Sequence, residues 1–301
     1  MAEANPPAVL RLDEAYCSRL LPVRDPAGHK GTFGTVVCVA GSLDYAGAAY
    51  MTGLAAVRGG AGLVAIAVPA SLRPIFAGRL PEAILLGLPE TEGGAIDHGL
   101  SINEITSLEP DALVIGPGLK ESDDYRALIN GLVSTMGAPA VLDAGALNML
   151  STSGEWWRQR GRNLVLTPHP GEFGRLTGSP VGPSDKERMD RCIDATQRFD
   201  QVVVLKGAYT VIAEPTGRVA VSPFANPALA TAGSGDVLAG LIGALLAQAV
   251  EPFDAACLGV YLHGMAGERI SERLGDAGLR ASDMPYEIAV TRHQLALNRV
   301  D

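Results

Sequence analysis

The 301-residue sequence is poor in cysteine and in charge, and each shortage excludes a class of protein. Its four cysteines, Cys17, Cys38, Cys192 and Cys257, are widely separated, with no CxxC pair and no Cys/His cluster. This spacing indicates neither a disulfide scaffold nor a zinc site. Charged residues make up only 19% of the chain, and the formal net charge is −9. Because nucleic-acid-binding proteins need a basic surface, we expect no nucleic-acid partner.

Long apolar segments are also missing. The most apolar one, residues 237–250, contains Gln248 and is shorter than the roughly 20 residues that a membrane-spanning helix needs. The N-terminus has no basic segment followed by an apolar one, so it lacks the pattern of a signal peptide. We therefore predict a cytoplasmic protein that does not enter a membrane.

What the chain does contain is an alternation of apolar runs and small-residue helical runs. The apolar runs are rich in Val, Ile and Leu without polar alternation, which is typical of parallel strands buried on both faces. They cover residues 35–40, 62–68, 112–116, 138–143, 163–167 and 202–206. Helices are predicted over residues 47–58, 122–136, 183–199, 236–250 and 253–274.

This order predicts an α/β fold, with a mostly parallel central sheet and helices on both faces. Residues 210–212 and 218–221, separated by Ala-Glu-Pro-Thr-Gly, predict a small hairpin at the sheet edge. No internal repeat or linker is found. We expect a lead segment over residues 1–28 and a single domain over residues 29–301.

The chemically unusual residues follow the predicted strands, where open α/β sheets form their ligand crevice. In Ala-Thr-Ala-Gly-Ser-Gly-Asp, residues 230–236, Gly233 and Gly235 permit a tight turn before a helix. The amides of such a turn favour phosphate oxygens, and Asp236 is placed to take a proton from a hydroxyl. An ordinary helix N-cap by Ser234 or Asp236 fits the same residues.

Other strand ends carry equally ambiguous groups. Lys206, before Gly207, either neutralises phosphate or is a plain strand-end lysine. His169, between two prolines, either contacts a substrate or lies in a surface loop. Gly118, in Gly-Pro-Gly-Leu, either lets a substrate lie on the backbone or only makes a turn. Asp143 either contacts magnesium through water or holds its loop, and we favour the second role.

A further glycine-rich segment, His-Lys-Gly-Thr-Phe-Gly at residues 29–34, precedes the first predicted main strand. Its glycines suit a flap over the site. Lys30 either offsets phosphate charge there or is solvated.

Taken together, these motifs resemble the NAD(P)H-hydrate dehydratase family in its stand-alone form. They occur in the family's order from His29 to about Asp283: HKGTFG, AGS followed by AGAA, GPGL, VLDAGALN, TPHPGE, LKGAYT, ATAGSGDVLAG, YLHG and ASDM. Each piece is unspecific alone, but the combination is highly specific.

The resemblance implies a ribokinase-like fold and a nucleotide-repair lyase. Such an enzyme dehydrates the S forms of the hydrates NADHX and NADPHX to NADH and NADPH. ADP, converted to AMP and phosphate with Mg²⁺, drives the reaction in the bacterial type, whereas eukaryotic relatives use ATP. A homotetramer is also implied. Because only a short segment precedes His29, we expect the NAD(P)HX epimerase, which is fused to the dehydratase in many relatives, to be a separate polypeptide.

Family roles carry over residue by residue. The positions that contact the hydrate are matched by Ala48, Gly118, His169 and Asp236, with Asp236 as the catalytic base. The AMP-binding positions are matched by Lys206, Gly207, Ala208, Tyr209, Thr210 and Gly235. No metal ligand is assigned.

The chain departs from the family pattern at several positions. Lys120 stands where the family often has glycine, and Ser234 replaces the usual Thr. Ala225 and Leu229 lie in the segment where the family commonly shows Gly and Met. These changes bear on nucleotide preference more than on the reaction.

Two other functions fit parts of the pattern. A small-alcohol kinase of the same fold, acting on a vitamin precursor, would share the glycine–aspartate turn but not HKGTFG and TPHPGE. A nucleotide-binding regulator without turnover would bind ADP yet form no product.

Overall fold

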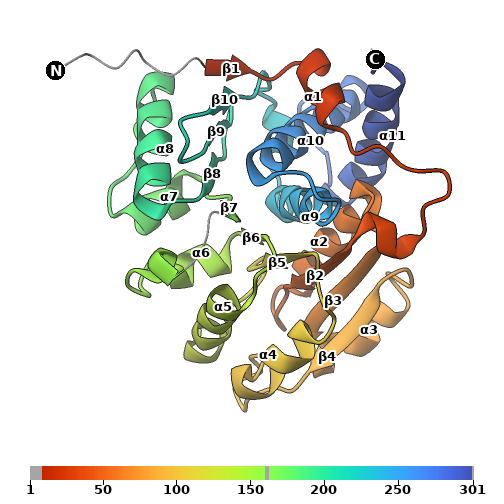
Figure 1. The fold of residues 1–301 in the computed structure, drawn as a ribbon, viewed down its shortest axis with the longest axis vertical. Helices are drawn as coiled ribbons and strands as arrows, with labels where there is room; N and C mark the ends of the chain where they lie inside the picture. Colours follow the sequence, from red (N-terminus) through yellow and green to blue (C-terminus); the bar gives the residue numbers. More distant parts are fainter. Residues whose placement is uncertain (1–8, 160–162, 300–301) are drawn as a thin grey trace.

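The computed structural model describes residues 9–159 and 163–299 and has one ten-stranded sheet. Its strands are β1 (Val9–Arg11), β2 (Thr35–Val39), β3 (Leu63–Pro69), β4 (Ile84–Leu88), β5 (Ala112–Ile115), β6 (Ala140–Leu142), β7 (Leu164–Leu166), β8 (Val202–Leu205), β9 (Val211–Ala213) and β10 (Val219–Val221). They lie in the order β1-β10-β9-β8-β7-β6-β5-β2-β3-β4, from top to bottom of Figure 1. All neighbours are parallel except β9, which runs against β8 and β10.

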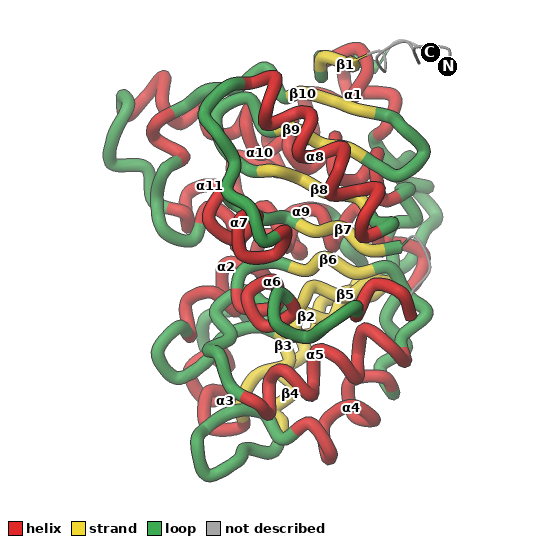
Figure 2. Tube along the Cα trace, turned by 90° about the vertical axis from the view of Figure 1, so that its left-hand side faces the viewer, coloured by secondary structure: helices red, strands yellow, loops and turns green. Residues whose placement is uncertain are grey.

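Helices cover both faces of this sheet. They are α1 (Glu14–Leu20), α2 (Ala46–Gly59), α3 (Arg73–Ala77), α4 (His98–Thr106), α5 (Asp123–Thr135), α6 (Gly145–Leu150), α7 (Pro170–Thr177), α8 (Asp185–Phe199), α9 (Ser234–Ala247), α10 (Pro252–Leu274) and α11 (Met284–Leu297). In Figure 1, α5 to α8 lie on one side of the strands and α9 to α11 on the other. Figure 2, turned by 90°, shows the same strand order behind α6, α7 and α8. No helix in the described part is long and apolar enough to cross a membrane.

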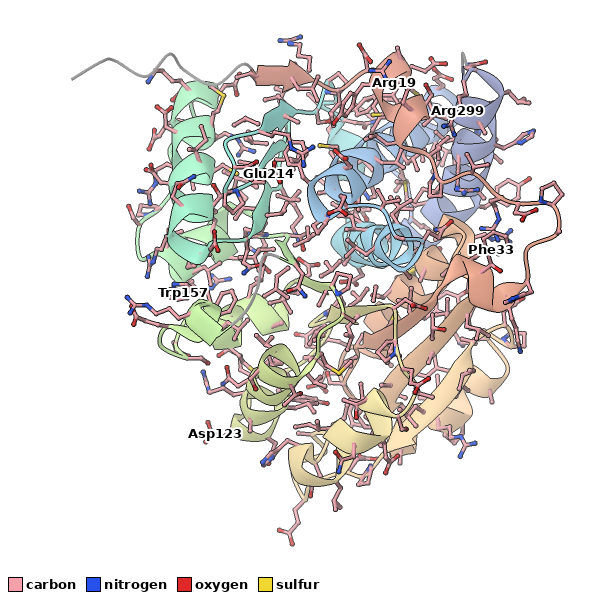
Figure 3. The ribbon with its side chains drawn as sticks, viewed as in Figure 1. Arg19, Phe33, Asp123, Trp157, Glu214 and Arg299 are labelled. Carbon is pink, nitrogen blue, oxygen red and sulfur yellow. The ribbon has the colours of Figure 1, made fainter. Side chains whose placement is uncertain are left out.

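Alternate residues of the parallel strands supply both layers of the core. In β2, Val36 and Cys38 pack with α9 and α10, whereas Val37 and Val39 pack on the opposite side, which carries α5 to α8. Because strand side chains alternate between the two faces, only a strand that is apolar throughout can serve both layers. Trp157, labelled in Figure 3, packs against Phe199 of the second layer, with their ring centroids 5.0 Å apart.

The predicted fold class is confirmed. The six predicted strands correspond to β2, β3, β5, β6, β7 and β8, the hairpin to β9 and β10, and the five helices to α2, α5, α8, α9 and α10. The short elements β1, β4, α1, α3, α4, α6 and α7 and the 14-residue helix α11 were not predicted.

Residues 9–28 take part in this architecture. β1 pairs with β10 at one edge of the sheet, and Leu12 accordingly donates its N–H to Val221 O. Leu12, Cys17 and Leu21 are buried in the same core layer as α9 and α10. The segment expected to be a lead therefore extends the sheet and covers one face of it.

The glycine-rich segment at residues 29–34 does not cover a strand-end site, so that expectation is wrong. It lies at the amino end of β2, where a β-carbon on Gly34 would come within 1.9 Å of Ala247 O, at the C-terminus of α9. Because a 14-residue helix is about 20 Å long, this segment is far from the glycine–aspartate turn at the start of α9. Lys30 is exposed.

Candidate active site

A cavity of about 720 Å³ lies beyond the carboxyl ends of β6, β7 and β8, which are neighbours in the middle of the sheet (Figure 1). Asp143 follows β6, His169 follows β7 and Lys206 follows β8, and all three line the cavity. The start of α9 supplies a further part of its wall through Ser234, Gly235 and Asp236. Parallel strands thus bring together groups that are far apart in the sequence.

The centre of the cavity wall is a buried group of charges. The Lys206 Nζ atom lies 2.6 Å from Asp143 Oδ1 and 3.9 Å from Glu172 Oε2. Burial alone would lower the pKa of Lys206, but Asp143, Glu172 and Asp236 together hold it above its ordinary value. The lysine therefore stays charged beside the cavity.

Asp236 is a carboxylate whose pKa lies well above its ordinary value. Burial raises the pKa of Asp236 to about 7, helped by the nearby Asp143 and Glu172 and opposed by Lys206. The pKa of Glu172 is also raised, first by burial and then by Asp143, against the pull of Lys206. A base whose pKa lies near neutrality suits proton abstraction at physiological pH.

The start of α9 is built to hold an anion. Its N-cap residue, Gly233, has φ +89°, a conformation that favours glycine, and no side chain caps the helix. The alternative of an ordinary N-cap by Ser234 or Asp236 therefore fails. Ser234 N–H donates to Thr231 O at 3.3 Å, but the amides of Gly235 and Asp236 have no acceptor within the described residues. These amides and the helix dipole attract negative charge.

Glycine at position 235 also lets the helix start approach the ion pair closely. A β-carbon there would lie 3.3 Å from Lys206 Nζ and 3.7 Å from Asp143 Oδ2. The missing side chain lets the helix start lie directly against the ion pair. Phosphate bound by the amides would then also be next to the lysine.

His169 is fixed by its own loop. Its Nδ1 atom accepts the Gly171 N–H at 3.0 Å, so Nε2 carries the proton and faces Glu172 Oε1 at 3.4 Å. Glu172 Oε2 in turn accepts the His169 backbone N–H at 2.9 Å. Glu172 therefore contacts both the histidine and, through the 3.9 Å approach, Lys206. No role was predicted for this glutamate from the motifs.

The stretch after β8 forms another wall. Gly207, Ala208 and Thr210 line the cavity, whereas Tyr209 does not. Tyr209 has φ +52°, and its N–H donates to Phe224 O. The buried Arg188 supports this stretch by donating hydrogen bonds to the carbonyl oxygens of Leu205 and Lys206, each at 3.3 Å. Its guanidinium would also lie 2.9 Å from a β-carbon on Gly207.

Ala48 and Gly118 lie outside the cavity wall but beside each other. A β-carbon on Gly118 would come within 2.6 Å of the Ala48 β-carbon. Ala49 instead faces Gly41, at 2.9 Å from a β-carbon placed there. The neighbouring Lys120 pairs with Asp44 at 2.8 Å on the surface. Of the alanines at the start of α2, Ala48 is thus the one next to Gly118.

Several cavity residues had no predicted role. Phe224, Asn226 and Thr231 lie in the irregular segment before α9, and His263 comes from α10. The only sequence signal for His263 was its place in Tyr-Leu-His-Gly, which carries no chemistry on its own. The irregular segment shows no periodicity from which its folding over the strand ends could be predicted.

The described residues offer no cluster of three or more His, Cys, Asp or Glu side chains suited to a metal ion. The carboxylate of Asp143 is already paired with the Lys206 ammonium. The acidic residues of the cavity therefore do not fit a protein-held metal site. Asp143 is the ion-pair partner of Lys206. That it holds its loop rather than contacting magnesium through water stays a prediction.

Comparison with known proteins shows which family the chain matches. A model of the NAD(P)H-hydrate dehydratase family matches residues 36–288. The ADP-dependent (S)-NAD(P)H-hydrate dehydratase of Xanthomonas campestris is 36% identical over 279 residues, covering 93% of this chain and 95% of that protein. The bifunctional NAD(P)H-hydrate repair enzyme of Moorella thermoacetica is 41% identical over 274 residues, covering 91% of this chain and 52% of that protein. The chain spans about half the length of such bifunctional relatives.

Solved structures of other proteins are also similar to this chain. The ADP/ATP-dependent NAD(P)H-hydrate dehydratase of Bacillus subtilis, co-crystallised with ATP and Mg²⁺, matches with a TM-score of 0.80 at 32% identity, covering 95% of this chain and 99% of that one. A ribokinase-like superfamily protein of Enterococcus faecalis has a TM-score of 0.82 at 24% identity, covering 96% of each chain. These matches confirm the ribokinase-like fold.

Proposed function

Because the chain belongs to the NAD(P)H-hydrate dehydratase family, we propose that it dehydrates the S forms of NADHX and NADPHX at the expense of ADP. One observation carries this proposal most. Asp236, with a pKa raised to about 7, lies in the same cavity wall as two free amides and the Lys206 ammonium. A base and an anion-binding helix start are thus side by side, as phosphoryl transfer to a hydroxyl requires.

In the proposed reaction, Asp236 takes the proton of the hydrate's hydroxyl, whose oxygen attacks the terminal phosphorus of ADP. AMP leaves, and the free amides of Gly235 and Asp236 stabilise the charge that develops on the transferred group. The new phosphate ester then loses inorganic phosphate, helped by the lone pair of the nicotinamide ring nitrogen. Loss of a proton from the neighbouring ring carbon to solvent then restores the double bond of the dihydropyridine. Phosphorylation therefore lets phosphate leave in place of hydroxide, which is a poor leaving group.

Most of the remaining site residues line the cavity, whereas Ala48, Gly118 and Tyr209 do not. His169 and Asp236 from the cavity wall are proposed to contact the hydrate. Ala48 and Gly118, which lie beside each other, are proposed to contact it as well. The nucleotide is proposed to lie along Lys206, Gly207, Ala208, Tyr209, Thr210 and Gly235. Mg²⁺ enters as the counter-ion of the nucleotide phosphates, held by them and by water. We assign it no protein ligand.

A homotetramer, a cytoplasmic location and a separate epimerase stay predictions. The relatives that match over half their length are bifunctional repair enzymes, and they do not test the epimerase prediction for this chain. A single folded unit over residues 9–299 is likewise proposed, on the ground that β1 and α1 join the common sheet and core.

The proposal is tested by incubating the chain with S-NADHX, Mg²⁺ and either ADP or ATP while following dihydronicotinamide absorbance. We expect absorbance to rise with ADP, with AMP and phosphate formed in equal amounts. Phosphorylation of hydroxyethylthiazole or a hydroxymethylpyrimidine, with no effect on S-NADHX, would identify a vitamin-precursor kinase instead. A thermal shift with ADP but no product would identify a regulator.

A further inference from the structure

His263 is a buried histidine to which the proposed reaction gives no role. It lies on α10, is only 8% exposed and contributes to the cavity wall. Its ring faces Ser234, the first residue of α9, which is 7% exposed and lines the same cavity. This is one buried polar side chain directed at the helix start that we propose binds phosphate.

The hydrogen bonds fix which ring nitrogen carries the proton. The His263 Nε2 atom lies 3.0 Å from the Ser234 carbonyl oxygen and 3.1 Å from Ser234 Oγ. A carbonyl oxygen can only accept, so the network assigns the proton to Nε2. Burial lowers the pKa of His263 to about 4, and the charge of Lys206 acts in the same direction. The ring is therefore neutral near pH 7.

This protonation state determines what the serine hydroxyl can do. A nitrogen that carries a hydrogen has no lone pair to offer, so Ser234 Oγ accepts from His263 and does not donate to it. No other partner of Ser234 Oγ is found in the described part of the chain. Its own proton is consequently free to point into the cavity, next to the free amides of Gly235 and Asp236.

We propose that His263 is a positioning residue, which orients the Ser234 hydroxyl so that it donates to the phosphoryl group transferred at the start of α9. This inference rests on the proposed function. It gives the helix start a third donor beside two amides, and it explains a buried histidine held against both polar atoms of one serine. The hydroxyl of the family's usual Thr would serve equally at position 234.

The test is a double-mutant cycle on the full chain, with kcat and KM measured for S-NADHX and ADP. We expect Ser234→Ala and His263→Leu each to lower kcat about 10–100-fold, with smaller changes in the KM of the hydrate. If the histidine acts through the hydroxyl, His263→Leu should lower kcat much less in the Ser234→Ala background. Fully additive losses, or an unchanged kcat in His263→Leu, would overturn the proposal.

Two conservative variants separate orientation from folding. Ser234→Thr keeps the hydroxyl and should retain most of kcat. His263→Gln offers an amide N–H to the serine carbonyl and should recover most of what His263→Leu loses. If His263→Leu is not folded, a His263→Gln variant that is folded but as slow as Ser234→Ala would count against the proposal.

One measurement does not depend on turnover. ¹⁵N NMR of the imidazole of His263 should show the Nε2–H tautomer, neutral down to about pH 4. An Nδ1–H tautomer, or titration near the ordinary histidine pKa of about 6.5, would refute the inference even if dehydration is observed. Absent dehydration by the wild-type chain would instead refute the proposed function.

Discussion

Asp143, Glu172, Lys206 and Asp236 share one buried space, where neighbouring charges shift the pKa values of Glu172, Lys206 and Asp236. Motif and strand-end position made Lys206 and Asp236 candidates from the sequence alone. Glu172 could not be singled out, because an acid in a helix's first turn is common and its approach to Lys206 depends on how β7 and β8 pair. Charge coupling of this kind arises only when the strands are side by side.

The coupling predicts a pH dependence. Because Asp236 must be deprotonated to act as a base, kcat/KM of the wild-type chain should fall as pH drops below about 7. Asp143 raises the pKa of Asp236, so Asp143→Asn should move this acid limb to lower pH, by about one unit. The measurement is kcat/KM for S-NADHX between pH 5 and 9.

A matched control is Asp123→Asn, because Asp123 lies on α5 with a fully exposed side chain (Figure 3). Its acid limb should coincide with that of the wild type. An Asp143→Asn limb that does not move, or moves to higher pH, contradicts the assignment of the limb to Asp236.

Among the elements, α9 contributes most to the proposed reaction, because its first turn carries Asp236 and the free amides. Its apolar residues predicted a helix from residue 236, and the structure begins it at Ser234, within the glycine–aspartate turn. β1 has only three residues, too few to show a period, and it was not predicted. The apolar strands and the helices between them were predictable, whereas β1 depends on its pairing with β10. The 14-residue helix α11 was also missed.

Gly235→Ala tests the close approach of α9 to the ion pair. The added β-carbon would lie 3.3 Å from Lys206 Nζ, so the lysine or the helix start must shift. We expect the KM for ADP to rise roughly tenfold while the free energy of unfolding changes by less than about 1 kcal/mol, since alanine favours helix.

The comparison variant is Gly78→Ala, since a β-carbon on Gly78 would have no neighbouring atom within 4 Å and the residue has no positive φ. It should leave the KM for ADP unchanged. A Gly235→Ala enzyme with wild-type ADP kinetics would show that the helix start does not hold the nucleotide as we propose.

For the whole molecule, the segment at residues 9–28 turns out to be attached to the core through β1 and the buried Leu12, Cys17 and Leu21. Their sequence is short and partly polar, and nothing in it indicates the pairing of β1 with β10, a strand about 200 residues away. Local sequence patterns do not predict pairing between strands that are so far apart in the sequence. What could be predicted from the sequence was the βαβ succession, and what could not was how the chain's start is attached to it.

The Leu12→Ala variant tests how much residues 9–28 contribute to the stability of the fold. Leu12 is 2% exposed and packs in the layer that contains α9 and α10. We expect the free energy of unfolding to fall by about 2–5 kcal/mol in urea titrations, because a buried leucine is replaced by a cavity. Val23→Ala, at a position 76% exposed, should change it by less than about 0.5 kcal/mol. Equal stabilities for the two variants would show that residues 9–28 are not part of the cooperative fold.

The central claim is that Asp236 is the base in a site that binds nucleotide independently of it. The most direct test is Asp236→Asn, with S-NADHX turnover and ADP affinity measured on the same preparation. We predict that kcat falls about 10²–10⁴-fold while the Kd for ADP changes little, because the amides and Lys206 remain. Near-normal turnover in Asp236→Asn would contradict the account.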